Sequence, residues 1–284
     1  MRIFGFVALV IGISAPVLAG SFGAQVVSYN AGTEPASRWY GDDAWNEVET
    51  VLLTDPSAAL GKPTGFIVEP YMTTPGTIVS PFSPAANPDQ IVSIGEGGSL
   101  TLRLENYAIA GAGVEIGLFA NVGVYTYGGA SGTLGVDGVT VEVSYDTSEW
   151  TSLGPITADI PTNVWADASD PYLTSTDGLT EADFSKPFTG EIADLLGKTY
   201  AEIKTSFDGS AGGYWIDLSP AGLTEVGYIR FSVADDGDAG KNMNFELDAV
   251  SVASGHIGAV TTPEPCSLGL LAMVGTCLLR RRGK

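Results

Sequence analysis

Hydrophobic and polar residues alternate with a period of two in several short segments of the chain. One such run places its leucines at Leu100, Leu102 and Leu104. Another carries the apolar side chains of Val139, Val141, Val143 and Tyr145. Successive side chains of a strand point to opposite faces of a sheet, so both runs predict strands with one buried face. A glycine-rich turn at residues 95–98 follows a short apolar segment at residues 91–94, which we expect to pair with the first run as a hairpin.

Further β-branched or aromatic runs between turn residues predict the remaining strands. These runs are residues 24–29, 65–68, 114–119, 214–218, 226–233 and 245–253. Residues 31–88 contain eight prolines, and proline lacks the amide that a ladder of hydrogen bonds needs. This part of the chain is therefore expected to be mostly loop with short strand pieces.

One short helix is predicted. Thr199 and Glu202 have the spacing of a capping box, in which each side chain accepts from the backbone amide of the other residue. The helix should end near Phe207, before the glycine-rich residues 208–213. The pattern as a whole predicts an all-β fold, a single β-sandwich with one short helix.

The first 19 residues have the pattern of a signal peptide. A basic second residue precedes an apolar stretch at residues 3–13, and residues 17–19 fit a signal-peptidase site. We expect the export machinery to carry the chain across the membrane and signal peptidase to cleave between Ala19 and Gly20. A transmembrane anchor is the alternative, but the apolar stretch is too short for one.

The C-terminal residues combine the triplet Pro263, Glu264 and Pro265, an uncharged apolar run at residues 266–279, and a basic cluster of Arg280, Arg281 and Arg282. The run is shorter than the roughly 20 residues of a typical transmembrane helix. Arginine stems snorkel and so lengthen the span, and the cluster fits the positive-inside rule. We interpret the run as a membrane helix; a soluble amphipathic tail is the alternative.

This arrangement resembles the PEP-CTERM sorting signal, which is recognised by a membrane transpeptidase-like enzyme called exosortase. The resemblance implies cleavage near the triplet and a body that is released from, or attached to, the cell surface of a Gram-negative-type bacterium. The expected organisation is a signal peptide at residues 1–19, an ectodomain at 20–254, a linker at 255–262 and the sorting segment at 263–284.

The body is similar to the jelly-roll-like ectodomains found beside other sorting tails. The residues that carry this likeness are 80–84 before the run at 91–104, the loop 208–213 leading into 215–218, and residues 245–250. The resemblance implies a jelly-roll-like sandwich.

Charge and cysteine content narrow the classes of partner. Between residues 20 and 265 the chain has eight basic and 33 acidic residues, a formal charge of −25. Such a surface repels nucleic acid, so no nucleic-acid partner is expected. Both cysteines, Cys266 and Cys277, lie in the sorting segment, so the mature body has no disulfide and depends on its hydrophobic core.

The acidic residues Asp235, Asp236 and Asp238, in a loop with glycines, form a candidate calcium site. Calcium prefers six to eight oxygen ligands, which an Asp-rich and Gly-rich loop can provide. Jelly-roll-like ectodomains often bind calcium near their last strand, so the resemblance adds Asp248. The alternative is a solvated turn, in which Asp and Gly simply favour the backbone conformation. No other cofactor is predicted.

Aromatic residues in polar surroundings suggest a platform for extracellular polysaccharide, with Trp39, Tyr40 and Trp165 as the candidates. Burial of these rings in the core is the alternative. Catalytic signatures are weak: His256 is the single histidine, no Gly-x-Ser-x-Gly motif occurs, and 33 acids make some carboxylate pair inevitable.

We therefore predict an exported, non-enzymatic protein of the cell surface or extracellular matrix, of structural or interaction type. It would be anchored in the membrane by its C-terminal helix until it is processed. A carbohydrate-binding or adhesive module is the second hypothesis. A carboxylate-based glycosidase is the third.

Overall fold

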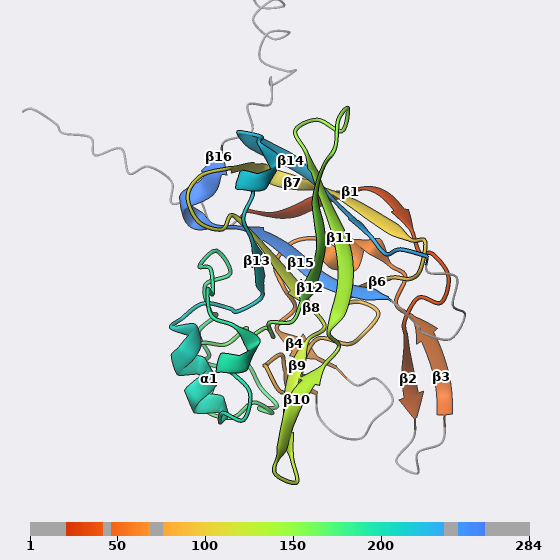
Figure 1. The fold of residues 1–284 in the computed structure, drawn as a ribbon. Coiled ribbons are helices and arrows are strands. Elements are labelled where there is room, and N and C mark those ends of the chain that lie inside the picture. The colour runs from red at the N-terminus through yellow and green to blue at the C-terminus, as the bar shows by residue number, and fades with distance from the viewer. Residues whose placement is uncertain (1–20, 42–46, 69–75, 236–243, 259–284) are drawn as a thin grey trace, which may run out of the picture.

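The computed structural model describes residues 21–41, 47–68, 76–235 and 244–258, and this part is mostly β-structure (Figure 1). The strands are β1 (Ser21–Asn30), β2 (Ser37–Gly41), β3 (Glu47–Leu52), β4 (Phe66–Ile67), β5 (Thr77–Ile78), β6 (Val92–Ile94), β7 (Ser99–Ile109), β8 (Ile116–Ala120), β9 (Gly123–Tyr127), β10 (Ala130–Leu134), β11 (Asp137–Ser144), β12 (Thr151–Ala158), β13 (Tyr214–Ile216), β14 (Glu225–Ser232), β15 (Phe245–Val252) and β16 (Ile257–Gly258). The helical elements are the α-helix α1 (Tyr200–Phe207) and the short 3-10 helices η1 (Pro56–Ala59), η2 (Ile192–Asp194), η3 (Ser219–Ala221) and η4 (Ser254–His256).

Ten strands form one large antiparallel sheet that nearly closes on itself. The strand order is β12-β11-β14-β7-β1-β15-β8-β13, with β16 paired to β7 and β6 paired to β15. Strand β1 joins the two halves of this sheet. Its first residues, Ser21 and Phe22, pair with β15, whereas the stretch from Gly23 to Asn30 pairs with β7.

The main hydrophobic core lies between the two halves. Leu100, Leu102 and Leu104 of β7 are buried, as their alternation predicted. They share one cluster with Leu118 of β8 and Leu247 of β15 from the opposite half. Each such side chain, when fully buried, contributes about 1.5–3 kcal/mol of transfer free energy. The core therefore holds the halves together without any cross-link.

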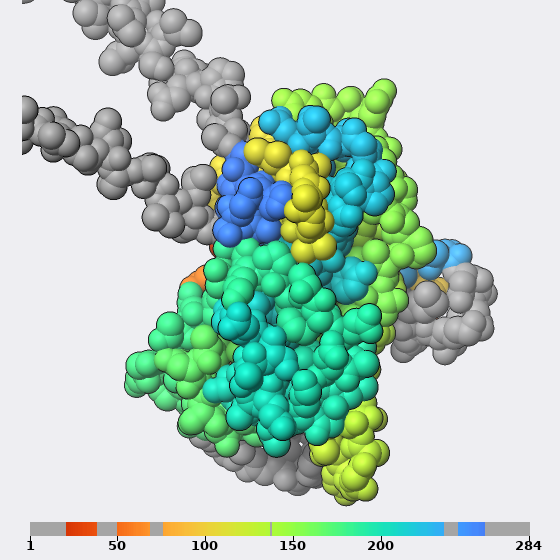
Figure 2. All heavy atoms as spheres, turned by 60° about the vertical axis from the view of Figure 1, so that its left-hand side comes forward, coloured from red at the N-terminus to blue at the C-terminus, as the bar shows by residue number. Residues whose placement is uncertain are grey.

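A second layer covers the outer side of β8, β13 and β15. Phe119 and Trp215 point into this layer, where Phe119 makes edge-to-face contacts with Phe184 at 5.8 Å and with Trp215 at 6.4 Å. The covering residues come from the loops before β6 and from residues 160–211, which include α1 (Figures 1 and 2). This layer consists mainly of loops and helical segments rather than of strands.

Most of the predicted elements are confirmed. The patterns at residues 24–29, 114–119, 139–145, 214–218, 226–233 and 245–253 correspond to β1, β8, β11, β13, β14 and β15. Helix α1 begins after Thr199, whose Oγ1 accepts from the Glu202 amide at 3.4 Å. Glu202 Oε2 accepts in turn from the Thr199 amide at 2.8 Å. The helix ends at Phe207, before Asp208 in the left-handed conformation.

The predicted hairpin of residues 91–94 with residues 99–105 is wrong. Strand β6 pairs with β15, whereas β7 pairs with β1 and β14. The turn between them connects the two halves of the sheet, and its Gly95 and Gly97 amides donate to the Ala31 and Val233 carbonyls at 2.8 and 3.0 Å. All three residues of β6 are buried, so the strand does not have the exposed face of a surface hairpin.

Several strands were not among the predicted ones. Strands β2 and β3 pair with each other inside the proline-rich part. Strand β12 contains Gly154 and Pro155, which disfavour a strand, but it lies at the end of the sheet order, where a missing amide is tolerated. The hairpin of β9 and β10 was also missed, because β10 begins with the small residues Ala130, Ser131 and Gly132.

The contacts of the body continue past the predicted linker boundary at residue 254. Strand β16 pairs with β7, and His256 Nδ1 lies 2.9 Å from the Ile109 carbonyl oxygen. His256 is also 3.7 Å from Glu115, a fully buried carboxylate that accepts from two backbone amides. Within the described ranges no helix combines the length and the apolar character that crossing a bilayer requires.

A close approach of the backbone at Gly212 gives the first prediction. Gly212 has φ +75°, and a Cβ there would lie 2.3 Å from the Pro161 carbonyl oxygen. Gly209 has φ +82° but no atom within 4 Å of such a Cβ, so it is the matched control. Both Gly→Ala variants should lose about 1–2 kcal/mol for the left-handed backbone, and Gly212→Ala about 1–3 kcal/mol more for the clash. Chemical denaturation measures the free energy of unfolding of both variants. Equal losses in Gly212→Ala and Gly209→Ala would contradict the close packing at Gly212.

Candidate functional site

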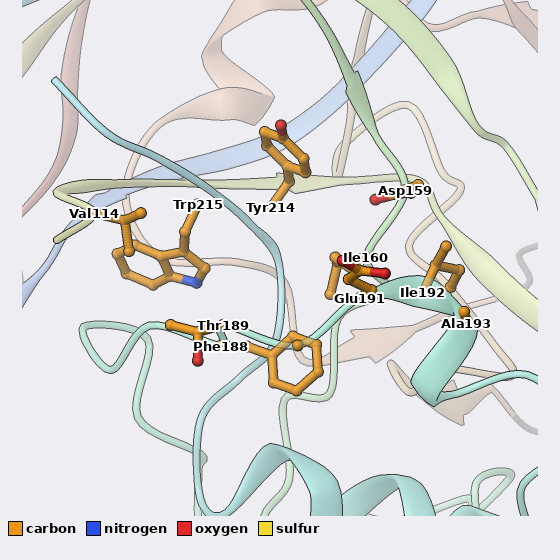
Figure 3. A pocket seen from close by; sticks show the side chains of 11 residues that line it. Val114, Asp159, Ile160, Phe188, Thr189, Glu191, Ile192, Ala193, Tyr214 and Trp215 are labelled. Atoms are coloured by element: carbon orange, nitrogen blue, oxygen red, sulfur yellow. The ribbon is translucent and has the colours of Figure 1, made fainter. Parts of the chain in front are cut away.

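A cleft of about 400 Å³ opens in the outer layer, beside the start of β13 (Figure 3). Four separate segments line it: Val114 before β8, residues 159–160 after β12, residues 188–193 around η2, and residues 214–215 of β13. The cleft thus lies where loops of the outer layer meet the edge of the large sheet.

The aromatic walls of the cleft are fixed by close packing. Trp215 is buried, and its indole Nε1 donates to the Gly212 carbonyl at 2.9 Å. A Cβ on Gly117 would lie 2.8 Å from the indole ring, so only glycine lets the ring approach the strand. Phe188 makes an edge-to-face contact with Phe207 at 4.9 Å. The walls therefore have defined positions before any ligand enters.

Two carboxylates, Asp159 and Glu191, lie toward one end of the cleft, with Val114 and Trp215 toward the other (Figure 3). Asp159 is partly buried, and its pKa is raised from its ordinary value by burial and, to a smaller extent, by the negative charge of Glu191. Glu191 is exposed at the start of η2, and its backbone amide donates to the Asp194 carboxylate at 3.1 Å.

This combination suits a small polyhydroxylated ligand. Binding pockets typically pair apolar walls with a few polar groups that fix orientation. The ring of Phe188 and the indole of Trp215 offer apolar contact, and the carboxylates of Asp159 and Glu191 accept hydrogen bonds from hydroxyl groups. A protonated Asp159 would also donate one.

A second hollow of about 450 Å³ shares Phe188, Thr189 and Gly190 with the cleft. It is lined in addition by Lys186 and Lys198. The Lys186 ammonium is 2.9 Å from the Asp208 carboxylate, an exposed pair of little energetic weight. The shared segment thus separates the cleft from a hollow that contains both lysines and the carboxylates Asp194 and Asp208.

Of the three residues of the predicted sugar platform, the structure describes the side chain of Trp165 alone. Trp165 packs inward: its indole Nε1 donates to the Gly65 carbonyl at 2.8 Å, and its ring contacts the buried clusters of the outer layer. It lines neither hollow. Trp39 and Tyr40 belong to β2, and their side chains lie outside the described part.

The candidate calcium ligands occupy different environments. Asp235 is exposed after β14, whereas Asp236 and Asp238 lie outside the described residues. Asp248 sits at an irregularity of β15 and is 2% exposed. Both of its carboxylate oxygens accept from the Thr64 amide, at 3.1 and 3.2 Å. Among the residues that the structure places, no group of three His, Cys, Asp or Glu side chains is arranged to hold a metal, and calcium binding stays a prediction.

Other predicted positions also lie outside the described residues. They are the cleavage site Ala19 and Gly20 and the sorting motif Pro263, Glu264, Pro265, Arg280, Arg281 and Arg282. The cleft residues Asp159, Phe188 and Glu191 were not predicted, because they come from loops without periodicity. Only Trp215, which follows a glycine-rich loop, gave a signal that could have been used.

The comparisons with known proteins add no relative to this description. No protein-family model matches the chain, and a search of curated proteins gives no match.

The buried Asp248 gives a prediction on pH. Burial raises its pKa well above the ordinary value, against the opposing effect of the Thr64 hydrogen bonds. A raised folded-state pKa gives stability that is present below the unfolded pKa and is lost as pH rises through the folded value. Asp248→Asn should therefore raise the melting temperature at pH 8 relative to the wild type, by about 2–4 °C per kcal/mol, and should have a smaller effect near pH 4.

Asp208→Asn is the control for this experiment. Asp208 is exposed, and its pKa is lowered by the hydrogen bond and charge of Lys186, so its substitution should not stabilise the protein at pH 8. Thermal unfolding at both pH values, with and without millimolar calcium, measures the effect. A lower melting temperature of Asp248→Asn at pH 8, and a loss of calcium-dependent stabilisation, would mean that Asp248 serves as a charged metal ligand.

Proposed function

We propose that this is an exported, non-enzymatic interaction protein of the cell surface or extracellular matrix, whose ligand is an extracellular polysaccharide. The export signal and the PEP-CTERM-like tail support the location, with an exosortase-type enzyme as the processing partner. The charge of −25 between residues 20 and 265 supports a partner other than nucleic acid.

The fold proposed for the ectodomain is a jelly-roll-like sandwich. Apart from β12, which forms a hairpin with β11, the strands of the large sheet from β7 to β15 alternate between its two halves in the order β7, β8, β11, β13, β14 and β15. Such repeated crossing between layers is typical of double Greek-key sandwiches. It supports the jelly-roll-like form over a simple meander.

The observation that carries the polysaccharide proposal is the cleft itself, which is lined by packed aromatic rings and by two carboxylates. Apolar ring faces bind the C–H surface of a sugar, and carboxylates bind its hydroxyl groups. Glycosidases also use two carboxylates. If the protein released sugars from a bound polymer, the glycosidase hypothesis would replace the binding hypothesis.

Affinity electrophoresis of the full chain in gels that contain neutral or acidic polysaccharides tests the proposal. Asp159→Asn keeps the shape of the cleft but removes its half-buried carboxyl, and Phe188→Ala removes one ring. Each variant should weaken retention about threefold to tenfold, because one hydrogen bond or aromatic contact contributes on the order of 1 kcal/mol.

Tyr172→Ala is the control, because Tyr172 is 54% exposed and lines neither hollow. Its retention should equal that of the wild type. Failure of the wild type to be retained by any polysaccharide would reject the proposal. New reducing ends in the gel matrix, lost in Asp159→Asn, would show an enzyme instead.

A further inference from the structure

The hairpin of β9 and β10 projects beyond the rest of the body (Figures 1 and 2). Its strands pair in register from Tyr127 opposite Ala130 to Gly123 opposite Leu134. The connecting residues Gly128 and Gly129 have φ +60° and +83°, as a tight hairpin turn with two left-handed residues requires. The hairpin is thus a regular element with two distinct faces.

One face of the hairpin is anchored to the body. Val124 on this face is 4% exposed and belongs to a cluster with Leu195, Ile203 and Phe207 of the outer layer. Because side chains alternate along a strand, Tyr125 and Tyr127 lie on the opposite face. Packing of Val124 against the layer around α1 therefore fixes which side of the hairpin faces solvent.

The solvent face is unusually apolar. Tyr125 is 39%, Tyr127 85% and Leu134 54% exposed, and their cross-strand partners on this face are small. Isolated exposed apolar residues need no explanation, but three that share one face of a hairpin form a patch. We call Tyr125, Tyr127 and Leu134 the hairpin patch.

The ring of Tyr125 lies over Gly132 on the neighbouring strand. A Cβ at Gly132 would lie 2.6–2.8 Å from the hydroxyl oxygen, Cζ and Cε1 of Tyr125. Glycine therefore lets the ring approach the backbone of β10, while Tyr125 stays 39% exposed. Tyr127 stands opposite Ala130, another small residue. The patch thus has the form of an aromatic platform.

No charged residue occurs between Glu115 and Asp137, although the chain as a whole has a formal charge of −20. A cationic partner would gain no electrostatic attraction from this hairpin. A neutral partner can bind here without desolvating the acidic side chains of the remaining surface. The area also limits the occupant. Three side chains of at most about 150–250 Å² each, partly covered already, fall short of the roughly 800 Å² per partner that a stable protein interface buries.

We propose that the hairpin patch is a second contact for a neutral polysaccharide, on which successive sugar rings stack against Tyr125 and Tyr127. Alternate residues of a strand are about 6.8 Å apart, so both rings can contact one extended polymer. This inference rests on the proposed polysaccharide-binding function and adds to the cleft a surface that recognises long chains.

The test compares the full chain with Tyr127→Ala and the double variant Tyr125→Ala/Tyr127→Ala, in affinity gels that contain neutral polysaccharides. Retention should fall about threefold to tenfold for Tyr127→Ala and further for the double variant. Tyr127→Phe keeps the ring and should retain binding. Tyr172→Ala is again the control. Binding of a short oligosaccharide in solution, which the cleft alone would hold, should not change.

The outcomes separate this inference from the function it rests on. If the wild type is retained, Phe188→Ala weakens retention and the double tyrosine variant does not, the hairpin patch is overturned and the cleft stands. If no polysaccharide retains the wild type, both proposals fail. If size-exclusion chromatography shows a wild-type dimer that Tyr127→Ala dissociates, a second copy of the chain covers the patch, which also overturns the inference.

Discussion

The burial of β8 on both of its faces determines much of this architecture. Ile116 and Leu118 point into the main core between the two halves of the sheet, whereas Phe119 points outward. An antiparallel strand usually leaves one face to water. Because the outer face here is also apolar, a covering layer is required, and the loops before β6 together with residues 160–211 provide it. The cleft is the place where this layer meets β13.

The covering layer explains why a tightly packed aromatic wall and an open cleft occur side by side. Gly117 lets the Trp215 indole lie close to the strand, the indole Nε1 donates to the Gly212 carbonyl, and Phe119 makes an edge-to-face contact with Trp215. Such packing holds the aromatic wall in place, and it requires glycine where the indole approaches the strand. The loop residues 188–193 only have to close over this wall, so they leave a hollow that carries Asp159 and Glu191 at its end. The charge-free hairpin is attached to the same layer through Val124.

Local sequence patterns predicted the individual strands and the helix better than they predicted which strands pair with each other. The alternation at Leu100 and Val141, and the capping box at Thr199, depend on interactions within one strand or one turn, which the sequence displays directly. The partner of β6 could not be derived, because an apolar run before a glycine-rich turn looks the same whether the chain folds back or crosses to the other half. Here the glycines of residues 95–98 bond to Ala31 and Val233 instead.

The candidate binding sites were harder to predict from the sequence than the strand pairing. Asp159, Phe188 and Trp215 meet only through the fold, and in a chain with 33 acidic residues the two carboxylates of the cleft carry no distinguishing mark. The hairpin of β9 and β10 did leave a signal, since Gly128 and Gly129 lie between two short runs, the first of which alternates Val124 and Thr126 with tyrosines. Small residues in β10 hid this signal, yet one of them, Gly132, lets the Tyr125 ring approach the backbone.

The central claim, that this body is exported and processed for display outside the cell, is tested most directly by intact mass spectrometry of the protein recovered from its native host, with membrane and medium analysed separately. The account predicts a species that begins at Gly20 and ends near Pro265. Chains that retain Arg280, Arg281 and Arg282 and are confined to the membrane would contradict it, because the tail would then be a plain anchor and the proposed surface role would lose its main support.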